Sequence, residues 1–222
     1  MTSELPSRIP IFPLPDTVFF PGTVLPLHVF EARYRKMVAD HLPGARVLGV
    51  ILLEPGWQED YYGSPAAYPV GCAGPMEDVT RLPDGRYTLQ VQGRWKIEVV
   101  RYLQTEPYRM AEVRELSERQ ADESLISVQQ AKTRLLGAYA SLASALEGRP
   151  SNPFTFDPSL EYVRLVNLAC MHLGIDAGEK QRLLELHDVD ERGRRVIRIL
   201  EQEHQRVARL QELEGDDESS VH

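Results

Sequence analysis

Leu82-Pro83-Asp84-Gly85-Arg86-Tyr87-Thr88-Leu89-Gln90-Val91 is the stretch of this sequence that decides the fold class of its first half. Asp84-Gly85 supplies the positive φ that tight hairpin turns need, and residues 87–91 then alternate apolar and polar side chains. Residues 94–99 alternate again, so their apolar side chains share one face of a strand. These are Trp95, Ile97 and Val99. The segment therefore predicts antiparallel β-structure.

The sequence on either side of this hairpin extends the same pattern. Short apolar stretches bounded by Gly and Pro predict further strands. They lie at 9–14, 23–27, 47–53, 70–80 and 108–113. A helix is expected at 30–38, where apolar side chains recur at helical spacing, and Pro and Gly residues predict a loop at 54–69. Many short strands separated by turns indicate a sandwich or a barrel.

The second half of the sequence is expected to be helical. Apolar residues recur at three-, four- and seven-residue spacing over 121–147, and Asp157-Pro158 has the form of a helix start. Asp176–Glu179 and Asp188–Glu191 have the form of capping boxes. The fold class is therefore α+β. We expect a β-barrel subdomain at 1–116, an α-helical bundle at 117–214 and a disordered acidic tail at 215–222.

Composition restricts the function and the compartment. The net charge is −8; residues 1–116 carry 12 basic and 14 acidic side chains, and the rest carry 13 and 19. Nucleic-acid binders usually have a basic excess, so nucleic acid is not an expected partner. Apolar runs such as 47–53 are too short to span a bilayer, and the N-terminus lacks the pattern of a secretory signal. Two distant cysteines fit a reducing compartment, so we expect a cytoplasmic protein.

Motifs that carry catalysis or bind cofactors are not found. No two glycines lie two positions apart, which excludes Gly-x-Gly-x-x-Gly, and Gly44 and Gly49 are not followed by the Lys of a P-loop. There is no Gly-x-Ser-x-Gly, no Cys-x-x-Cys and no pair of histidines at i, i+4. We expect no enzyme activity and no catalytic, cofactor-binding or metal-binding residue. Cys72 and Cys170 are predicted to be small core residues.

Two features could serve binding. The loop at 54–69 concentrates aromatic side chains, which are the candidate protein-binding residues because aromatics on loops often anchor partners. They are Trp57, Tyr61, Tyr62 and Tyr68. The alternative is that they cover the end of the barrel. The last helix is arginine-rich at 192–198, and we expect a solvated face on which these arginines pair with neighbouring glutamates.

A family resemblance begins at the N-terminal segments. Ile11-Phe12-Pro13-Leu14, then Phe20-Pro21-Gly22, then Leu25-Pro26-Leu27-His28-Val29-Phe30-Glu31-Ala32-Arg33-Tyr34 resembles the opening signature of the Lon substrate-binding domain. Residues 70–73, 82–86, 93–97 and 106–108 resemble its later strands. Trp95 and Lys96 stand where the family commonly has Phe and Arg, which preserves an aromatic-in, basic-out alternation. Leu183-Leu184-Glu185-Leu186 and the last helix resemble the end of its helical part.

The resemblance implies a PUA-like β-barrel followed by a helical bundle. In Lon proteases this region helps to recruit unfolded or tagged protein segments, and the ATPase and protease domains follow it. Because this chain ends at His222, both are expected to be missing. A non-catalytic protein- or peptide-binding module is therefore predicted, related to proteolysis, with a protease or a chaperone as a further partner. Glu31 and Arg33 are expected to begin the short helix and not to bind.

Two other functions stay open at the level of sequence. PUA-like folds often bind RNA, so an RNA-binding protein is the alternative; the acidity opposes it, and a basic stripe on the folded surface would favour it. A small-molecule enzyme or sensor would need a groove with clustered titratable groups between barrel and bundle. The client and the oligomeric state are not encoded in any motif we find.

Overall fold

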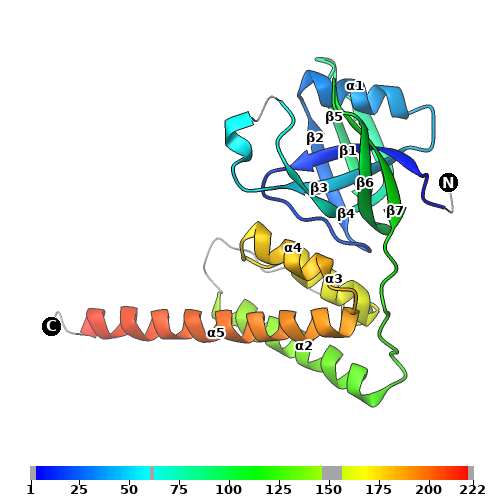
Figure 1. The fold of residues 1–222 in the computed structure, drawn as a ribbon. Helices are drawn as coiled ribbons and strands as arrows, with labels where there is room; N and C mark the ends of the chain where they lie inside the picture. The colour runs from blue at the N-terminus through cyan, green and yellow to red at the C-terminus, as the bar shows by residue number, and fades with distance from the viewer. Residues whose placement is uncertain (1–3, 61–62, 147–156, 220–222) are drawn as a thin grey trace. The chain divides into compact units, whose positions relative to one another are not determined.

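The computed structural model describes residues 4–60, 63–146 and 157–219 and divides the chain into two compact units. The first comprises residues 1–118 and 174–187, and the second comprises 119–173 and 188–222. The segment 174–187, expected in the helical bundle, thus belongs with the strands. Figure 1 shows the strands of the first unit and the helices of the second.

Five strands of the first unit close into a hydrogen-bonded ring. They are β1 (Arg8–Leu14), β3 (Val47–Leu53), β4 (Ala67–Arg81), β6 (Trp95–Gln104) and β7 (Arg109–Glu115). β1 pairs with β3 in parallel and with β7 antiparallel, β3 pairs with β4, β4 with β6 and β6 with β7. The expected β-barrel, and with the helices the α+β class, is confirmed.

β4 closes the ring because part of it pairs on both edges. Gly71, Cys72 and Ala73 lie opposite residues of β3 on one edge and of β6 on the other. A Cβ on Gly71 would overlap the carbonyl oxygen of Val50, so this position tolerates only glycine without a shift. Farther along, β4 leaves the ring and pairs with β5 (Tyr87–Gln92), which pairs with β2 (Val24–Val29).

The barrel is filled by alternating side chains of the ring strands, as the period of two predicts. The buried cluster consists of Ile9, Ile11, Val47, Ile51, Ala73, Trp95, Ile97, Ala111 and Val113. Gly49 lies among them, and a Cβ there would press on the side chains of Ile9 and Ile11. Trp95 and Ile97 share this interior, as expected, and Cys72 is a buried core residue.

The described residues of the barrel unit include two α-helices. α1 (Ala32–His41) lies at one end of the strands, and α4 (Ala177–Glu185) lies at the other (Figure 1). The expected capping box begins α4, because the Asp176 carboxylate accepts a hydrogen bond from the Glu179 amide at 3.0 Å. Gln181 donates its amide N–H to the Val70 carbonyl of β4 at 3.0 Å. This bond holds α4 against the strand.

Lys96 was predicted to point outward from its strand, but its side chain is buried. Its ammonium donates to the Leu186 carbonyl at 2.8 Å, at the C-terminal end of α4, and lies 3.6 Å from the Glu118 carboxylate. The side chains of Lys96 and Glu118 are 1% and 6% exposed. The alternation of β6 is real, but α4 covers its second face, and a cation suits the end of a helix where carbonyls are unpaired.

Removing the charge of Lys96 tests this anchor. Lys96→Met leaves the Glu118 carboxylate buried without this cation, so the free energy of unfolding should fall by about 3 kcal/mol. Lys96→Met combined with Glu118→Leu should recover part of the loss, because both charges then disappear together. Urea unfolding of the wild type, the single and the double variant measures the difference. An unchanged stability of Lys96→Met relative to the wild type would show that the ion pair has no role.

Among its described residues, the second unit contains three helices that pack on one another: α2 (Ile126–Ala145), α3 (Tyr162–His172) and α5 (Val189–Ser219). α2 and α5 run in the same direction, since Arg134 pairs with Glu201 and, farther along both helices, Gln211 bonds to the Ala145 carbonyl. Asp188 caps α5 as expected, accepting a hydrogen bond from the Asp190 amide at 2.9 Å. Cys170 is a buried core residue, as predicted.

Helix boundaries differ from the sequence prediction in two places. Asp157-Pro158 begins a turn and not a helix; the Asp157 carboxylate accepts from the Ser159 amide, and α3 begins only at Tyr162. α5 extends to Ser219, beyond the start of the tail expected to be disordered, because its regular backbone continues through Gly215. Residues 220–222 lie outside the described part of the chain.

The arginines of α5 do not all lie on a solvated face. Arg195 pairs with Glu191 at 2.7 Å, as predicted, and Arg194 pairs with Asp190 at 2.5 Å. Arg192, however, is fully buried and donates to the Asn167 side-chain oxygen of α3 at 2.7 Å. Its prediction as a surface residue is wrong, because α3 covers this side of α5 and offers a polar acceptor there. Glu201 and Glu203 pair with Arg134 and Arg206, not with the arginines at 192–198.

Tyr162 carries an unsatisfied hydroxyl in the core of the second unit. The side chain is fully buried, and no described group accepts or donates a hydrogen bond to its oxygen. A Cβ at position 193 would overlap this hydroxyl, which explains Gly193 inside α5. Burial raises the pKa of Tyr162 to about 12, and the charge of Asp190 acts in the same direction.

Tyr162→Phe removes the hydroxyl and keeps the ring. At neutral pH we expect an unchanged or higher melting temperature, because no hydrogen bond is lost. The folded-state pKa of about 12 exceeds the ordinary value of 10. The folded state therefore holds this proton more tightly than the unfolded state does. The resulting contribution to the free energy of unfolding is complete below pH 10 and is lost as the pH rises through about 12. Thermal melts from pH 7 to 12 should show a smaller alkaline loss in the variant. A marked destabilisation at neutral pH would contradict this account.

Candidate functional site

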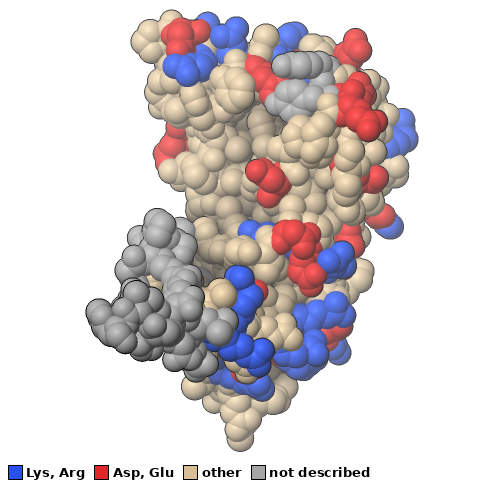
Figure 2. Space-filling model, turned by 90° about the vertical axis from the view of Figure 1, so that its left-hand side faces the viewer, with Lys and Arg blue, Asp and Glu red and all other residues tan. Residues whose placement is uncertain are grey.

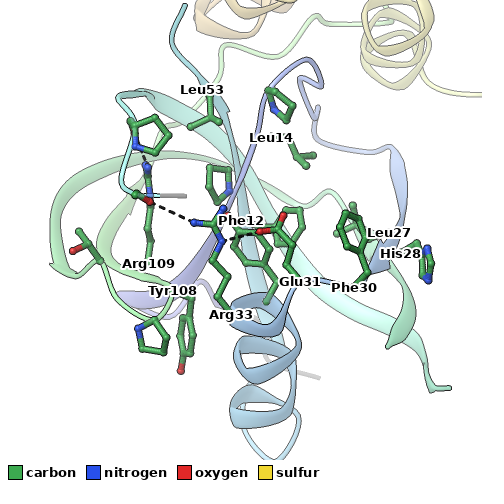
Figure 3. Close-up of a pocket in the computed structure, with 17 residues that line it drawn as sticks. Phe12, Leu14, Leu27, His28, Phe30, Glu31, Arg33, Leu53, Tyr108 and Arg109 are labelled. Carbon is green, nitrogen blue, oxygen red and sulfur yellow. Dashed lines mark hydrogen bonds and ion pairs between the residues drawn. The ribbon is translucent and has the colours of Figure 1, made fainter. Parts of the chain in front are cut away.

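A cavity of about 240 Å³ lies in the barrel unit, where several chain segments converge. The ends of β1, β2 and β3 contribute to it, together with the start of α1, the start of β7 and the loop residues Gly63 and Pro65. Figure 3 shows the side chains that surround it. Sequence-distant segments thus form one concave surface, which is the usual form of a binding site.

The floor of the cavity is apolar. Phe12 of β1 and Tyr34 of α1 are buried there, with ring centroids 4.4 Å apart. Leu14, Leu27 and Leu53 form further parts of the wall (Figure 3). The strand pattern explains these positions, since each leucine lies in a strand that runs up to the cavity. An apolar side chain of a partner would lose water on entering this surface.

Phe30 lies at the edge of the cavity and is 60% exposed. It occupies the short connection between β2 and α1, directly before Glu31, the N-cap residue of the helix, and its ring lies 6.2 Å from that of His28. A large aromatic held in solvent beside an apolar hollow is a typical anchor for a partner.

Two arginines supply the polar end. Arg33 pairs with Glu31 at 3.0 Å and donates to the Gly63 carbonyl at 3.4 Å. Arg109, 6% exposed, donates to the Pro65 carbonyl at 2.6 Å. Both guanidiniums therefore reach the same short segment of the loop (Figure 3). Arg33 and Glu31 do begin the helix region as predicted, but they also line the cavity.

Tyr108 fixes one wall of the cavity to α1. Its hydroxyl donates to the Asp40 carboxylate at 2.8 Å, and its ring meets His41 edge-on at 5.8 Å. Burial and the bond to Asp40 raise the pKa of Tyr108 to about 12, so the donor remains protonated at neutral pH. Hydrogen bonds from Lys36 and from Tyr108 lower the pKa of Asp40. The wall is held by side chains, which makes it preorganised.

A second hollow of about 650 Å³ lies elsewhere on the barrel unit. Arg46 and Asp78, which line it, both have positive φ, at 55° and 50°. Its charged lining residues balance, with Arg46 and Arg94 against Glu77 and Asp78. Backbone strain can mark a functional position. The mixed charges select no ligand class, so the apolar cavity is the stronger candidate.

The candidate residues chosen from sequence are only partly placed. Trp57 lies in a 3-10 turn, Trp57–Asp60, and is partly exposed. Tyr68 was expected in the loop at 54–69, but it lies in β4, which begins at Ala67. Neither residue lines the apolar cavity, to which the same loop gives Gly63 and Pro65 instead. Tyr61 and Tyr62 lie outside the described residues.

The sequence reasoning missed the residues that the structure brings together. Phe30, Arg109 and Tyr108 come from segments that were assigned only structural roles. Phe30 is the first apolar residue of the helix expected at 30–38, but α1 begins only at Ala32, so Phe30 lies outside the helix and its apolar face. Arg109 carried no signal either, since it is one of four charged residues in β7, the strand Arg109–Glu115.

Within the described residues, neither metal binding nor membrane insertion adds to this site. Among the described residues no three His, Cys, Asp or Glu side chains are grouped so as to hold a metal ion. None of the helices described is both long and apolar enough to cross a membrane. On the face shown in Figure 2, the barrel unit presents a broad area with few charges, and the helical unit presents basic and acidic side chains side by side.

Comparisons with known proteins agree with the fold. Residues 8–202 match the family described as the ATP-dependent protease La (Lon) substrate-binding domain. The chain is 28% identical to the Lon protease of Flavobacterium johnsoniae over 98% of this chain and 26% of that protein. It is 29% identical to the Lon protease of Dictyoglomus thermophilum over 91% of this chain and 25% of that protein. The chain thus spans about a quarter of the length of these curated relatives.

Two solved structures share the fold. A Lon N-terminal domain protein from Xanthomonas campestris has a TM-score of 0.56 at 21% identity, over 86% of this chain and 96% of that one. The N-terminal domain of a Mycobacterium avium complex Lon protease has a TM-score of 0.57 at 18% identity, over 87% and 97%. With a family match over most of its length, this chain belongs to the Lon substrate-binding domain family.

Proposed function

We propose that this chain is a non-catalytic, cytoplasmic binding module for protein segments that expose apolar side chains, and that the cavity beside Phe30 receives them. The observation that carries the proposal is Phe30 itself, which is 60% exposed beside a cavity of about 240 Å³ with an apolar floor. Unfolded or tagged segments offer apolar side chains that folded proteins hide. The family description, a substrate-binding domain, supports protein substrates.

The proposed function is binding alone, without catalysis. The matched region covers about a quarter of the Lon proteases named above, so their activity is not carried over to this chain. A protease or a chaperone is the partner that would act on a bound segment. The surface extends, in this proposal, from the cavity along the loop to Trp57 and to Tyr68 at the start of β4, since Gly63 and Pro65 of that loop line the cavity.

Phe30→Ala tests the cavity directly. Affinity for a permanently unfolded protein, reduced and alkylated, should fall by about 1–2 kcal/mol if Phe30 is a binding anchor. Stability should change little, because the ring is mostly in solvent. Val100→Ala is the matched control, as Val100 is an exposed apolar residue of β6 that does not line the cavity. Fluorescence anisotropy gives the affinities; an equal loss in both variants, or in neither, would refute the site.

Trp57→Ala tests the extension of the surface. If Trp57 contacts clients, the same titration should show weaker binding at an unchanged melting temperature. If Trp57 instead covers the end of the barrel, the melting temperature should fall and the affinity of the folded fraction should stay the same. Thermal melts and titrations on one protein preparation therefore separate the two roles. The second result would limit the surface to the cavity.

A further inference from the structure

Arg109 is a buried cation whose partners in the described structure are all uncharged. Its guanidinium donates to the Pro65 carbonyl at 2.6 Å and to the Tyr102 hydroxyl at 3.4 Å, and it lies 5.4 Å from the Tyr102 ring centroid. With 6% of the residue exposed, the charge has lost most of its water. A buried charge is costly unless an opposite charge accompanies it, so Arg109 has capacity for an anion.

The cavity as a whole has a positive excess at this end. Arg33 is already paired with Glu31, so the charge of Arg109 is the one left to be balanced among the described lining residues. The two guanidiniums approach residues 63–65 from α1 and from β7 (Figure 3). A planar guanidinium binds a carboxylate through two parallel hydrogen bonds, more strongly than it binds a neutral oxygen.

The rest of the cavity specifies what else the anion must carry. Phe12, Leu14, Leu27 and Leu53 line it, so the ligand needs an apolar side chain close to its charge. The volume of about 240 Å³ is below the roughly 300–1,000 Å³ of pockets that enclose drug-sized molecules, and suits one residue and not a folded element. An internal Asp or Glu brings its charge in place of an apolar side chain. A C-terminal residue brings both on one Cα.

We propose that the cavity binds the C-terminal residue of client chains, with its α-carboxylate on Arg109 and its apolar side chain on the floor beside Phe12. This inference rests on the proposed function and adds a substrate class to it: chains that end in an apolar residue with a free carboxylate. Arg33 contributes to the field around the carboxylate, and Phe30 covers the preceding residue of the client.

The experiment compares three labelled peptides on the full chain. One ends in leucine as the free acid, the second is its C-terminal amide, and the third is an amide with aspartate in place of the leucine. The free acid should bind the wild type about tenfold more tightly than either amide. Arg109→Gln should reduce the affinity for the acid to that for the leucine amide and leave the amide unchanged. Arg114→Gln, an exposed arginine on the same strand, is the control for net charge and should keep the tenfold ratio.

The outcomes separate this inference from the proposed function. Equal binding of acid and leucine amide would overturn the inference and leave apolar binding intact, whereas no binding of any peptide or unfolded protein would overturn both. If Arg109→Gln still prefers the free acid over the leucine amide, the carboxylate binds elsewhere. If the aspartate amide peptide binds tightly, the site recognises acidic side chains. If a thermal melt shows that Arg109→Gln is unfolded, two other measurements test the inference. One is the affinity of Arg33→Gln for the peptides. The other is the ratio of the wild-type affinities for the free acid and the leucine amide, which needs no variant.

Discussion

Closure of the barrel depends on β4 pairing along both edges over the same three residues. Gly71, Cys72 and Ala73 hydrogen-bond to β3 and to β6, which removes the free edges that an open sheet of these strands would have. The close approach leaves no space for a Cβ at Gly71. The positions of the strand ends follow from this closure, and the cavity is formed by those ends. A site built on a closed ring keeps its geometry without a ligand.

The sequence contains enough to predict the fold class, the positions of the strands along the chain and the starts of α4 and α5, because these depend on local patterns. The Asp84-Gly85 turn and the caps at Asp176 and Asp188 lie where expected, since each is decided by a few neighbouring residues. Lys96 and Arg192 were predicted at the surface and are buried. Their burial depends on what covers them, which is α4 in one case and α3 in the other. Periodicity identifies two faces of an element but not how many of them are covered.

The candidate site was less predictable for a related reason. Aromatic density directed attention to Trp57 and Tyr68, which lie on neighbouring parts of one segment. The cavity instead combines single residues from distant segments, such as Phe12, Phe30 and Arg109. A residue like Arg109 becomes notable only when the structure shows that its charge is buried among neutral oxygens. Residues 25–34, which carry part of the family resemblance, supply several of the residues that line the cavity, although the signature itself gave them no binding role.

The chain passes between the two compact units three times, after Glu118, after Leu173 and after His187. Residues 174–187, which include α4, therefore form part of the barrel unit while their neighbours on both sides belong to the helical unit. No single cleavage releases either unit whole, and neither can be made by truncation from one end. During synthesis, the Lys96 ammonium can bond to the Leu186 carbonyl only after α4 has been made, so the barrel unit is incomplete until then. The order of synthesis is thus interleaved: the barrel is completed only after α2 and α3 have been made, and the bundle is completed last, with α5.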